Sequence, residues 1–374
     1  MKPRVRMFSD PETGKVWGTR TEGTSVTVIS GTAKKLKEVE KPQTDLAAVG
    51  RFLEKEEGAR LRKGMVLIEE EPPPGQPYLI RFLSKGYTGV LTLTALEGSL
   101  LTNLFGGEGD HLALIHPDGS GDLLAELSPG QLLRGVCIAP ELGRDFLLVG
   151  HGVYQVDHES NELSCRVPEN KSPASFLSVQ NGVAAWYEEP DVVVSDLRQE
   201  VEIFRSSVTP QLYSGHTTQL TGALSPDAKL LALCWEAGVL LLHTLSEPGS
   251  VRRIEGDFEM VEKLAFTPDG RRLLFKERYG RSTLHAFEVD TGTAVADWPD
   301  FGDLAMGDFA IESDGERLAV TQGRRAQVYD LASLDLSLSI ELDMVVKSAA
   351  VAWTDEGALG VRTDLGCVAL YNAG

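Results

Sequence analysis

The sequence predicts a mainly β protein, in which a β-propeller follows a small α+β module. Two observations lead to this fold class. After residue 78, short β-type runs separated by Gly, Pro, Asp and Asn recur about every 40 residues, which is the spacing of propeller blades. The first 68 residues instead combine β-type runs with one helical pattern. We therefore expect two domains in the 374 residues.

The front module, residues 1–68, is expected to contain a β-hairpin and a helix. Residues 15–20 and 25–29 are short β-type runs joined by a segment that suits a turn. Thr44 can cap a helix that begins at Asp45, because apolar residues follow it at helical spacing. Gly64 stands where such a helix should end.

Residues 69–77, with the sequence Glu-Glu-Glu-Pro-Pro-Pro-Gly-Gln-Pro, mark the boundary between the two domains. Three like charges and four prolines within nine residues disfavour both a sheet ladder and a helix interior. This composition is typical of a semi-rigid spacer. We therefore assign residues 1–68 to the front module, 69–77 to a Glu/Pro-rich linker and 78–374 to the propeller.

Repeated turns mark the blades. Residues 225–228 (Ser-Pro-Asp-Ala), 267–270 (Thr-Pro-Asp-Gly) and 313–315 (Ser-Asp-Gly) each precede a β run. In such turns Pro presets φ, Asp hydrogen-bonds the backbone nearby, and Gly supplies a positive φ. With the turn glycine, or Ala228 in its place, as the marker we expect seven blades, with six or eight as alternatives. The markers are Gly109, Gly143, Gly182, Ala228, Gly270, Gly315 and Gly357.

The last blade is expected to take a strand from much earlier in the chain. The sequence stops at Gly374, directly after the third β run of this blade, which would leave an open sheet edge. Two spare β-type segments precede the first blade, at residues 78–83 and 89–95. We expect one of them to pair with the last blade and close the ring.

Residues 8–10, 15–17, 24–28, Lys55 and residues 61–65 follow a pattern by which the front module, over residues 6–68, resembles a WGR domain. The Trp-Gly-Arg tripeptide that names the family would fall at or beside residues 28–31 (Val-Ile-Ser-Gly), where the following glycine alone matches. In polymerase relatives this tripeptide touches a DNA end. Because the tripeptide is absent here, the resemblance does not extend that activity to this chain.

The later repeats resemble the WD-repeat family and its degenerate bacterial relatives. Gly215-His216 followed by residues 225–227 matches the entry of a blade in that family, in which the histidine joins a hydrogen-bond network within the sheet. Tyr329-Asp330 is the nearest match to the Trp-Asp pair that names the family. The resemblance implies a bacterial-type propeller and names no partner.

The net charge of −19 is unevenly distributed. Residues 1–71 carry 14 Lys and Arg against 12 Asp and Glu, so the excess of acid lies in the propeller. An acidic body repels phosphate backbones and anionic membranes, and any nucleic-acid contact would have to come from the front module. No run approaches the ~20 apolar residues of a membrane-spanning helix. The spacing of Cys137, Cys165, Cys234 and Cys367 fits neither a disulfide framework nor a metal site, and we interpret them as reduced core thiols of a cytoplasmic protein.

Ten residues are candidates for contacts with partners. Aromatic side chains in inter-blade loops and hairpins often anchor partner proteins, although they can also pack between adjacent sheets. Two basic clusters in the front module would form a surface for nucleic acid or an acidic peptide if they converge, and otherwise a solvated face balanced by nearby glutamates. The candidates are Trp186, Tyr187, Trp298, Phe301, Lys34, Lys35, Lys37, Arg60, Arg62 and Lys63.

We expect a non-enzymatic protein–protein interaction scaffold that binds other proteins, and no membrane, through the propeller faces, with the front module as a second binding element. The sequence contains no Gly-x-Ser-x-Gly elbow, no phosphate loop and no His-Glu-x-x-His motif. No cofactor and no metal are expected, because turn chemistry explains the recurrent aspartates (Asp227, Asp269, Asp314 and Asp355). The alternatives are a nucleic-acid-associated adaptor that binds through the basic front module, and a hydrolase or lyase with a site in the propeller channel.

Overall fold

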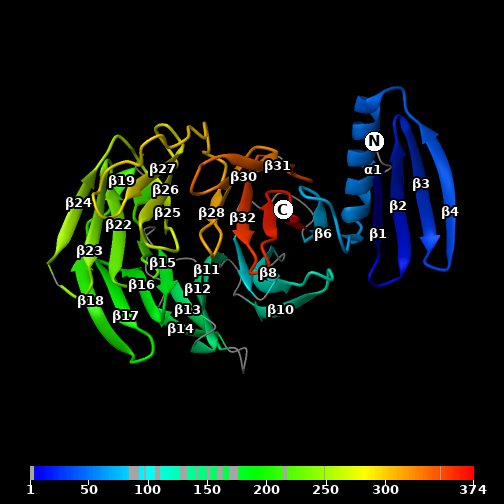
Figure 1. Cartoon of the computed structure of the whole chain (residues 1–374). Coiled ribbons are helices and arrows are strands. Elements are labelled where there is room, and N and C mark those ends of the chain that lie inside the picture. The colour runs from blue at the N-terminus through cyan, green and yellow to red at the C-terminus, as the bar shows by residue number, and fades with distance from the viewer. Residues whose placement is uncertain are drawn as a thin grey trace.

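The fold is described from a computed structural model, which is drawn in Figure 1. The structure describes residues 4–83, 92–96, 98–105, 110–126, 133–139, 142–149, 152–157, 163–167, 176–213, 217–247, 249–345 and 347–374. The described chain is mainly β, as the sequence predicts. No helix in these ranges is long and apolar enough to cross a membrane.

The front module is an antiparallel sheet with one helix against it. The predicted hairpin is present as β2 and β3, and the structure adds β1 and β4 on either side. Strand β4 shows no apolar alternation in the sequence, because almost all of its side chains are exposed on an edge strand. The elements are β1 (Arg4–Ser9), β2 (Lys15–Glu22), β3 (Ser25–Thr32), β4 (Lys35–Pro42), α1 (Leu46–Leu61) and β5 (Val66–Ile68).

The start of α1 differs by one residue from the expected cap. Asp45, rather than Thr44, is the N-cap, and its carboxylate accepts a hydrogen bond of 2.7 Å from the backbone N–H of Ala48. A carboxylate here also lies at the positive end of the helix dipole. This hydrogen bond lowers the pKa of Asp45. Gly64 follows the helix with φ of 88°, as a helix stop requires.

Six separate sheets of three or four antiparallel strands, numbered here as blades one to six, follow in the described chain. Blades one to three are β7 (Leu93–Leu96), β8 (Ser99–Phe105), β9 (Asp110–Ile115) and β10 (Gly121–Glu126); β11 (Leu133–Ala139), β12 (Arg144–Val149), β13 (Gly152–Asp157) and β14 (Leu163–Val167); and β15 (Leu177–Gln180), β16 (Val183–Glu188), β17 (Asp191–Asp196) and β18 (Val201–Ser207). Blades four to six are β21 (Thr221–Leu224), β22 (Leu230–Glu236), β23 (Val239–Thr244) and β24 (Val251–Glu255); β25 (Val261–Phe266), β26 (Arg272–Glu277) and β27 (Leu284–Glu288); and β28 (Phe309–Ile311), β29 (Arg317–Gln322), β30 (Arg325–Asp330) and β31 (Leu336–Glu341). A two-stranded hairpin, β19 (Gln211–Tyr213) with β20 (Thr217–Gln219), precedes blade four.

The ring is completed by a four-strand group of mixed origin. Three strands come from the end of the chain, β32 (Ala349–Trp353), β33 (Leu359–Thr363) and β34 (Cys367–Tyr371), and the fourth is β6 (Pro77–Phe82). Strand β32 contacts both β28 and β7, so the group lies between blades six and one. Of the two spare segments considered for this place, residues 78–83 contain most of the closing strand β6, while residues 93–95 of the other belong to β7.

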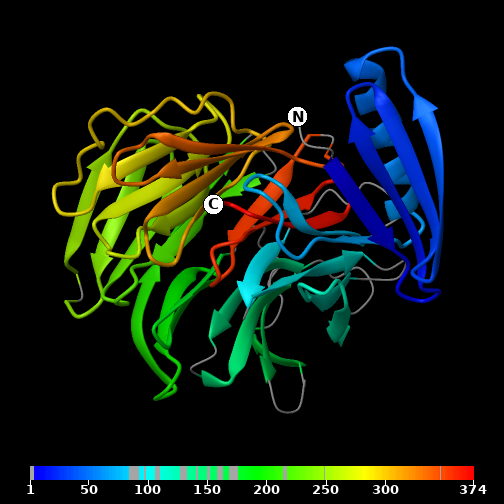
Figure 2. The ribbon, with the colours of Figure 1, turned by 45° about the vertical axis from the view of Figure 1, so that its right-hand side comes forward.

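Strand β6 also pairs with the front module. Its Leu79 and Ile80 lie opposite Ile68 and Leu67 of β5, and β5 pairs with β1. One nine-stranded sheet therefore runs from β32 in the ring to β4 at the far edge of the module. Figure 2 shows the module standing beside the blue and red strands of this shared sheet.

Residues 69–77 do not form the spacer that their composition suggested. They turn back as a tight loop between β5 and β6, which begins with a hydrogen bond from Glu69 N to Tyr78 O. The loop is fixed to the end of the chain by Asn372, whose Nδ2 donates to Pro72 O at 2.6 Å and whose O accepts from Gly75 N at 2.7 Å. Pro72 and Pro73 are tolerated because each accepts a hydrogen bond through its carbonyl group, from Asn372 and Gln76, and needs no N–H.

The turns used to count the blades have the positive φ that the sequence predicts. Gly143, Gly182, Ala228, Gly270, Gly315 and Gly357 all have a positive φ. In the first blade the equivalent turn, between β7 and β8, contains Gly98 (φ of 75°). The expected marker Gly109 and the blade-entry histidine His216 lie outside the described residues. The expectation for the cysteines fails at Cys165, which is exposed, whereas Cys234 and Cys367 are buried.

The substitutions Ala228→Gly and Gly270→Ala, at equivalent turns of two blades, should change the free energy of unfolding in opposite directions. Ala228 has φ of 54°, where an L-residue with a Cβ is strained, so Ala228→Gly should stabilise the protein by about 0.5–1 kcal/mol. Gly270→Ala should destabilise it by about 1–2 kcal/mol. The nearest atom to a Cβ at Gly270 would be Pro226 Cδ at 3.9 Å, so the loss would come from the backbone alone. Urea denaturation measures both, and equal signs would contradict this account.

The shared sheet predicts that the module and the ring unfold together. Ile80 is fully buried in a core cluster that includes Phe8 and Leu61 of the module and Val361 and Ala369 of the ring. Ile80→Ala should cost about 3 kcal/mol and raise hydrogen exchange equally in α1 and β33. Leu36→Ala, on the exposed face of β4, is the control and should change stability by less than about 0.5 kcal/mol. Loss of protection in α1 alone would show that the module is independent.

Candidate partner-binding sites

Blade five has an incomplete outer edge. In the described part of the chain this blade has three strands, whereas the other five separate blades have four. Residues 289–308, which follow β27, contain no strand. An isolated bridge joins Phe287 to Ala294, with hydrogen bonds from Glu288 N to Thr293 O and from Val295 N to Ala286 O. Continuing this register would place residue 297 opposite Leu284, but Asp297 has φ of 56° and turns the chain away.

The side chain of Trp298 takes over the contact that the missing strand would have made. Its indole Nε1 donates a hydrogen bond of 2.9 Å to Leu284 O. Phe301, which lies 5.8 Å from it between ring centroids, is buried and also packs edge-on against Tyr329. The indole is therefore held in one position by a hydrogen bond and by the core below it.

A cavity of about 970 Å³ lies beside this edge, between the loop that follows β24 and residues 281–303. We call it the blade-five groove. Its apolar lining includes Phe258, Phe287 and Trp298. Four exposed carboxylates also line it, and the basic residues among its lining are Arg281 and His285. The four acidic residues are Glu255, Asp257, Asp300 and Asp303.

The basic residues of the groove already have acidic partners. Arg281 forms an exposed ion pair with Asp257. His285 Nε2 lies 3.2 Å from Glu277 Oε2, and the imidazole stacks on Phe275. The groove therefore presents more negative than positive charge to a ligand.

The sequence pointed to one residue of this groove, Trp298, and missed the rest. A usable signal was present, because residues 290–303 contain four aspartates and no apolar alternation where a fourth strand was due. The acidic rim could not be recognised from the sequence, since Glu255 and Asp257 come from the preceding blade.

The other aromatic candidates are less accessible. Tyr187 and Phe301 are buried, with exposed fractions of 3% and 7%, so the structure does not support them as surface residues. Trp186 is partly buried and packs in the core cluster of blades two and three. Trp186 and Tyr187 are adjacent in β16, so their side chains point to opposite faces of the sheet and each packs toward a different neighbouring blade.

Three residues of the two basic clusters, Lys35, Lys37 and Arg60, lie on one face of the front module's sheet. The register places Phe8, Trp17, Ser30 and Lys37 in one row across four strands, and residues opposite each other point to the same face. The guanidinium of Arg60 lies over the Trp17 ring at 4.8 Å. Lys35 lies two residues from Lys37 on β4 and therefore points to the same face, while Lys34 lies in the preceding turn. Arg62 is the C-cap of α1, and Lys63 follows it.

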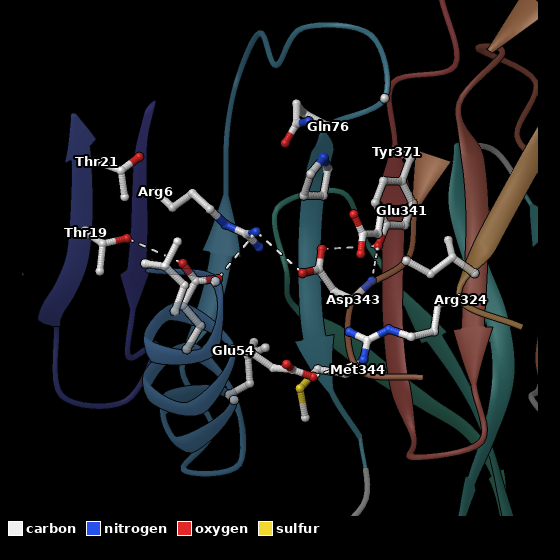
Figure 3. A pocket seen from close by; sticks show the side chains of 18 of the residues that line it. Arg6, Thr19, Thr21, Glu54, Gln76, Arg324, Glu341, Asp343, Met344 and Tyr371 are labelled. Atoms are coloured by element: carbon white, nitrogen blue, oxygen red, sulfur yellow. Dashed lines mark hydrogen bonds and ion pairs between the residues drawn. The ribbon is translucent and has the colours of Figure 1, made fainter. Parts of the chain in front are cut away.

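A second cavity, of about 450 Å³, lies between the front module and the ring. Figure 3 shows Arg6 of β1 at its centre. Its Nη1 lies 3.4 Å from Glu57 Oε2 on α1 and 3.5 Å from Asp343 Oδ1, which follows β31 in the ring. Burial alone would lower the pKa of Arg6, but the carboxylates of Asp343 and Glu57 outweigh it and raise that pKa. Arg6 therefore remains charged and links the two domains.

Asp343 is in turn held by Tyr371 of β34. The backbone N–H of Asp343 donates to the Tyr371 hydroxyl at 3.0 Å, and the hydroxyl donates to Asp343 Oδ2 at 3.3 Å. A second, exposed ion pair joins Arg324 of the ring to Glu54 of α1 at 3.1 Å. We interpret this cavity as the polar part of the junction, since its charged groups hold one another across it.

Ser99, His116 and Asp122 form a hydrogen-bonded line on blade one. Ser99 Oγ lies 3.0 Å from His116 Nδ1, and His116 Nε2 lies 2.9 Å from Asp122 Oδ2. Ser99 is 5% exposed, so its hydroxyl is inaccessible to a substrate, and the line fastens the turn between β9 and β10. In the described residues no group of three or more His, Cys, Asp or Glu side chains is placed to hold a metal ion.

The aspartates of the blade turns make the contacts that turn chemistry requires. Asp227 Oδ1 accepts hydrogen bonds from Ser225 Oγ and from the backbone N–H of Lys229. Asp269 accepts the equivalent pair from Thr267 and Arg271, and Asp314 accepts from the backbone N–H of Glu316.

The buried hydroxyl of Tyr371 predicts a loss of stability at high pH. Burial, and then the nearby Asp343 carboxylate, raise its pKa well above the ordinary value. A tyrosine whose pKa is higher in the folded than in the unfolded protein contributes stability that is complete below its unfolded-state pKa of about 10. This contribution is lost as the pH rises above that value. The unfolding free energy of the wild type should therefore fall more steeply between pH 9 and pH 11 than that of Tyr371→Phe. Parallel curves from urea denaturation would contradict this.

Comparison with known proteins gives the fold and no family. No family model matches the chain, and no curated protein matches it. Among solved structures, a chain in the "Crystal Structure of Mitotic Checkpoint Complex" is similar with a TM-score of 0.61 and 15% sequence identity, over 81% of this chain and 95% of that chain. At this identity the likeness concerns the fold alone, which is that of a WD-repeat-like β-propeller.

Proposed function

We propose that the protein is a non-enzymatic scaffold that binds partner proteins through its propeller and uses the front module as a second binding element. The shared nine-stranded sheet is the observation that carries this proposal. It holds the module against the ring, so that surfaces of both parts keep fixed relative positions. A partner that binds both surfaces does not have to pay a further entropic cost of positioning the second surface relative to the first.

The similarity to a WD-repeat-like propeller supports the same function, because this fold commonly serves as a protein-interaction scaffold. We further propose that the ring has seven blades, with β32, β33, β34 and β6 as the seventh. The contacts of β32 with both β28 and β7 support this count.

For the front module we propose a WGR-like domain whose basic face is the second binding element. The register that puts Lys35 and Lys37 on the same sheet face as Trp17 supports this role. We place the protein in the bacterial cytoplasm on the basis of the sequence resemblances and cysteine spacing.

The test is affinity purification of the full chain from its native cells at moderate salt, with and without nuclease. Stoichiometric protein partners that survive nuclease treatment are expected. A variant with Lys35→Glu and Lys37→Glu should lose the part of the partner set that needs the module. The charge-matched control carries Lys229→Glu and Arg271→Glu, two exposed residues in blade turns of the ring. Recovery of nucleic acid, with proteins lost on digestion, would overturn the scaffold in favour of a nucleic-acid adaptor.

A further inference from the structure

We propose that the blade-five groove binds an extended, lysine- or arginine-rich segment of a partner protein. The inference rests on the proposed scaffold function and names the chemistry of a partner at one site. It follows from three features of the groove: its size, the sign of its rim and the aromatic residues that line it.

The groove is large enough for a peptide segment. Its volume of about 970 Å³ is at the upper end of the range of about 300–1,000 Å³ for ligand pockets. It exists because the chain between β27 and β28 does not form a fourth strand, which elsewhere covers the outer edge of a blade. The groove therefore results from the path of the backbone and does not depend on one side-chain rotamer.

The rim has the charge that a basic segment requires. Asp300 and Asp303 each use one carboxylate oxygen to accept a backbone N–H of their own turn, from Gly302 and Ala305. These turns hold the carboxylates in place. Glu255 and Asp257 also line the groove, where Glu255 is paired with Arg253 and Asp257 with Arg281. The charge offered to a ligand therefore comes mainly from Asp300 and Asp303. The same rim repels an acidic peptide or a nucleic acid, and the net charge of −19 attracts basic partners from a distance.

The lining suits the long side chains of lysine and arginine. Their methylene stems pack on apolar surface while the charged heads remain at the carboxylates, and an arginine or lysine beside an indole gains cation–π attraction. Trp298, which is partly exposed, offers such surface within the same cavity as the acidic rim. Because the indole is already fixed by Leu284 O, little side-chain ordering is needed on binding.

The test is a selection of random twelve-residue peptides displayed on yeast against the purified full chain. The rim variant carries Asp300→Asn and Asp303→Asn, which remove two charges and keep the acceptors of both turns. The matched control carries Asp314→Asn and Asp330→Asn, two exposed turn aspartates outside the groove whose carboxylates also accept backbone N–H groups.

We expect the enriched peptides to be rich in Lys and Arg, to bind the rim variant about fivefold more weakly at 0.1 M salt, and to bind the control variant unchanged. They should also protect the amides of residues 284–287 and 292–295 from hydrogen exchange. Trp298→Leu should weaken binding further.

Three results would overturn the inference: no enriched peptide, enriched peptides without net positive charge, or equal binding to the wild type and the rim variant. If any of these occurs while the native partners survive nuclease treatment, the scaffold function stands and the groove is not its site. If protein partners are absent as well, the proposed function itself fails.

Discussion

The pairing of β6 on both of its edges is the interaction on which the rest of the structure depends. On one side it supplies the outer strand to β32, β33 and β34, and on the other it carries the ladder into β5 and the front module. Leu79 and Ile80 are both fully buried, and they belong to two different core clusters. Alternation along one strand therefore directs Ile80 to the core shared with the front module and Leu79 to the core shared with blade one.

The junction between module and ring gains its specificity from buried charge. A hydrophobic core joins any two apolar faces, but the contact of Arg6 with Glu57 and Asp343 requires one alignment of α1 and the loop after β31. Buried ion pairs add little net stability against apolar replacements, and breaking one is costly. Their effect here is to make other orientations of the module unfavourable, which is what a scaffold with two binding surfaces needs.

Much of the fold could be predicted from the sequence because it is repeated. Ser225-Pro226-Asp227 and its later equivalents predicted turns that the structure contains, and the hydroxyl–aspartate hydrogen bonds explain why these residues recur. The first blade was harder, because its turn between β7 and β8 contains Gly98, whereas the expected marker Gly109 lies outside the described residues. The front module's β4 was missed because a charged edge strand has no apolar pattern.

The binding sites were less predictable, for a physical reason. Exposure of an aromatic residue depends on which blade it faces, and adjacent residues such as Trp186 and Tyr187 face opposite ways. Residues 69–77 were expected to separate two domains, yet they form a loop in which Pro72 is held by Asn372, 300 residues later. Local composition described the conformation of this segment and gave no information on the long-range partner.

The position of β6 also has a consequence for how the chain is made. Phe82 of β6 lies opposite Cys367 of β34, so the pairing cannot form until residues 367–371 have left the ribosome. During synthesis the β6 edge that later receives β34 is an unprotected template for other strands. Closure between such distant segments is slow compared with the local hairpins of each blade. A second nascent copy could donate its own β34 at this stage, which makes strand exchange between chains the characteristic assembly error of this architecture.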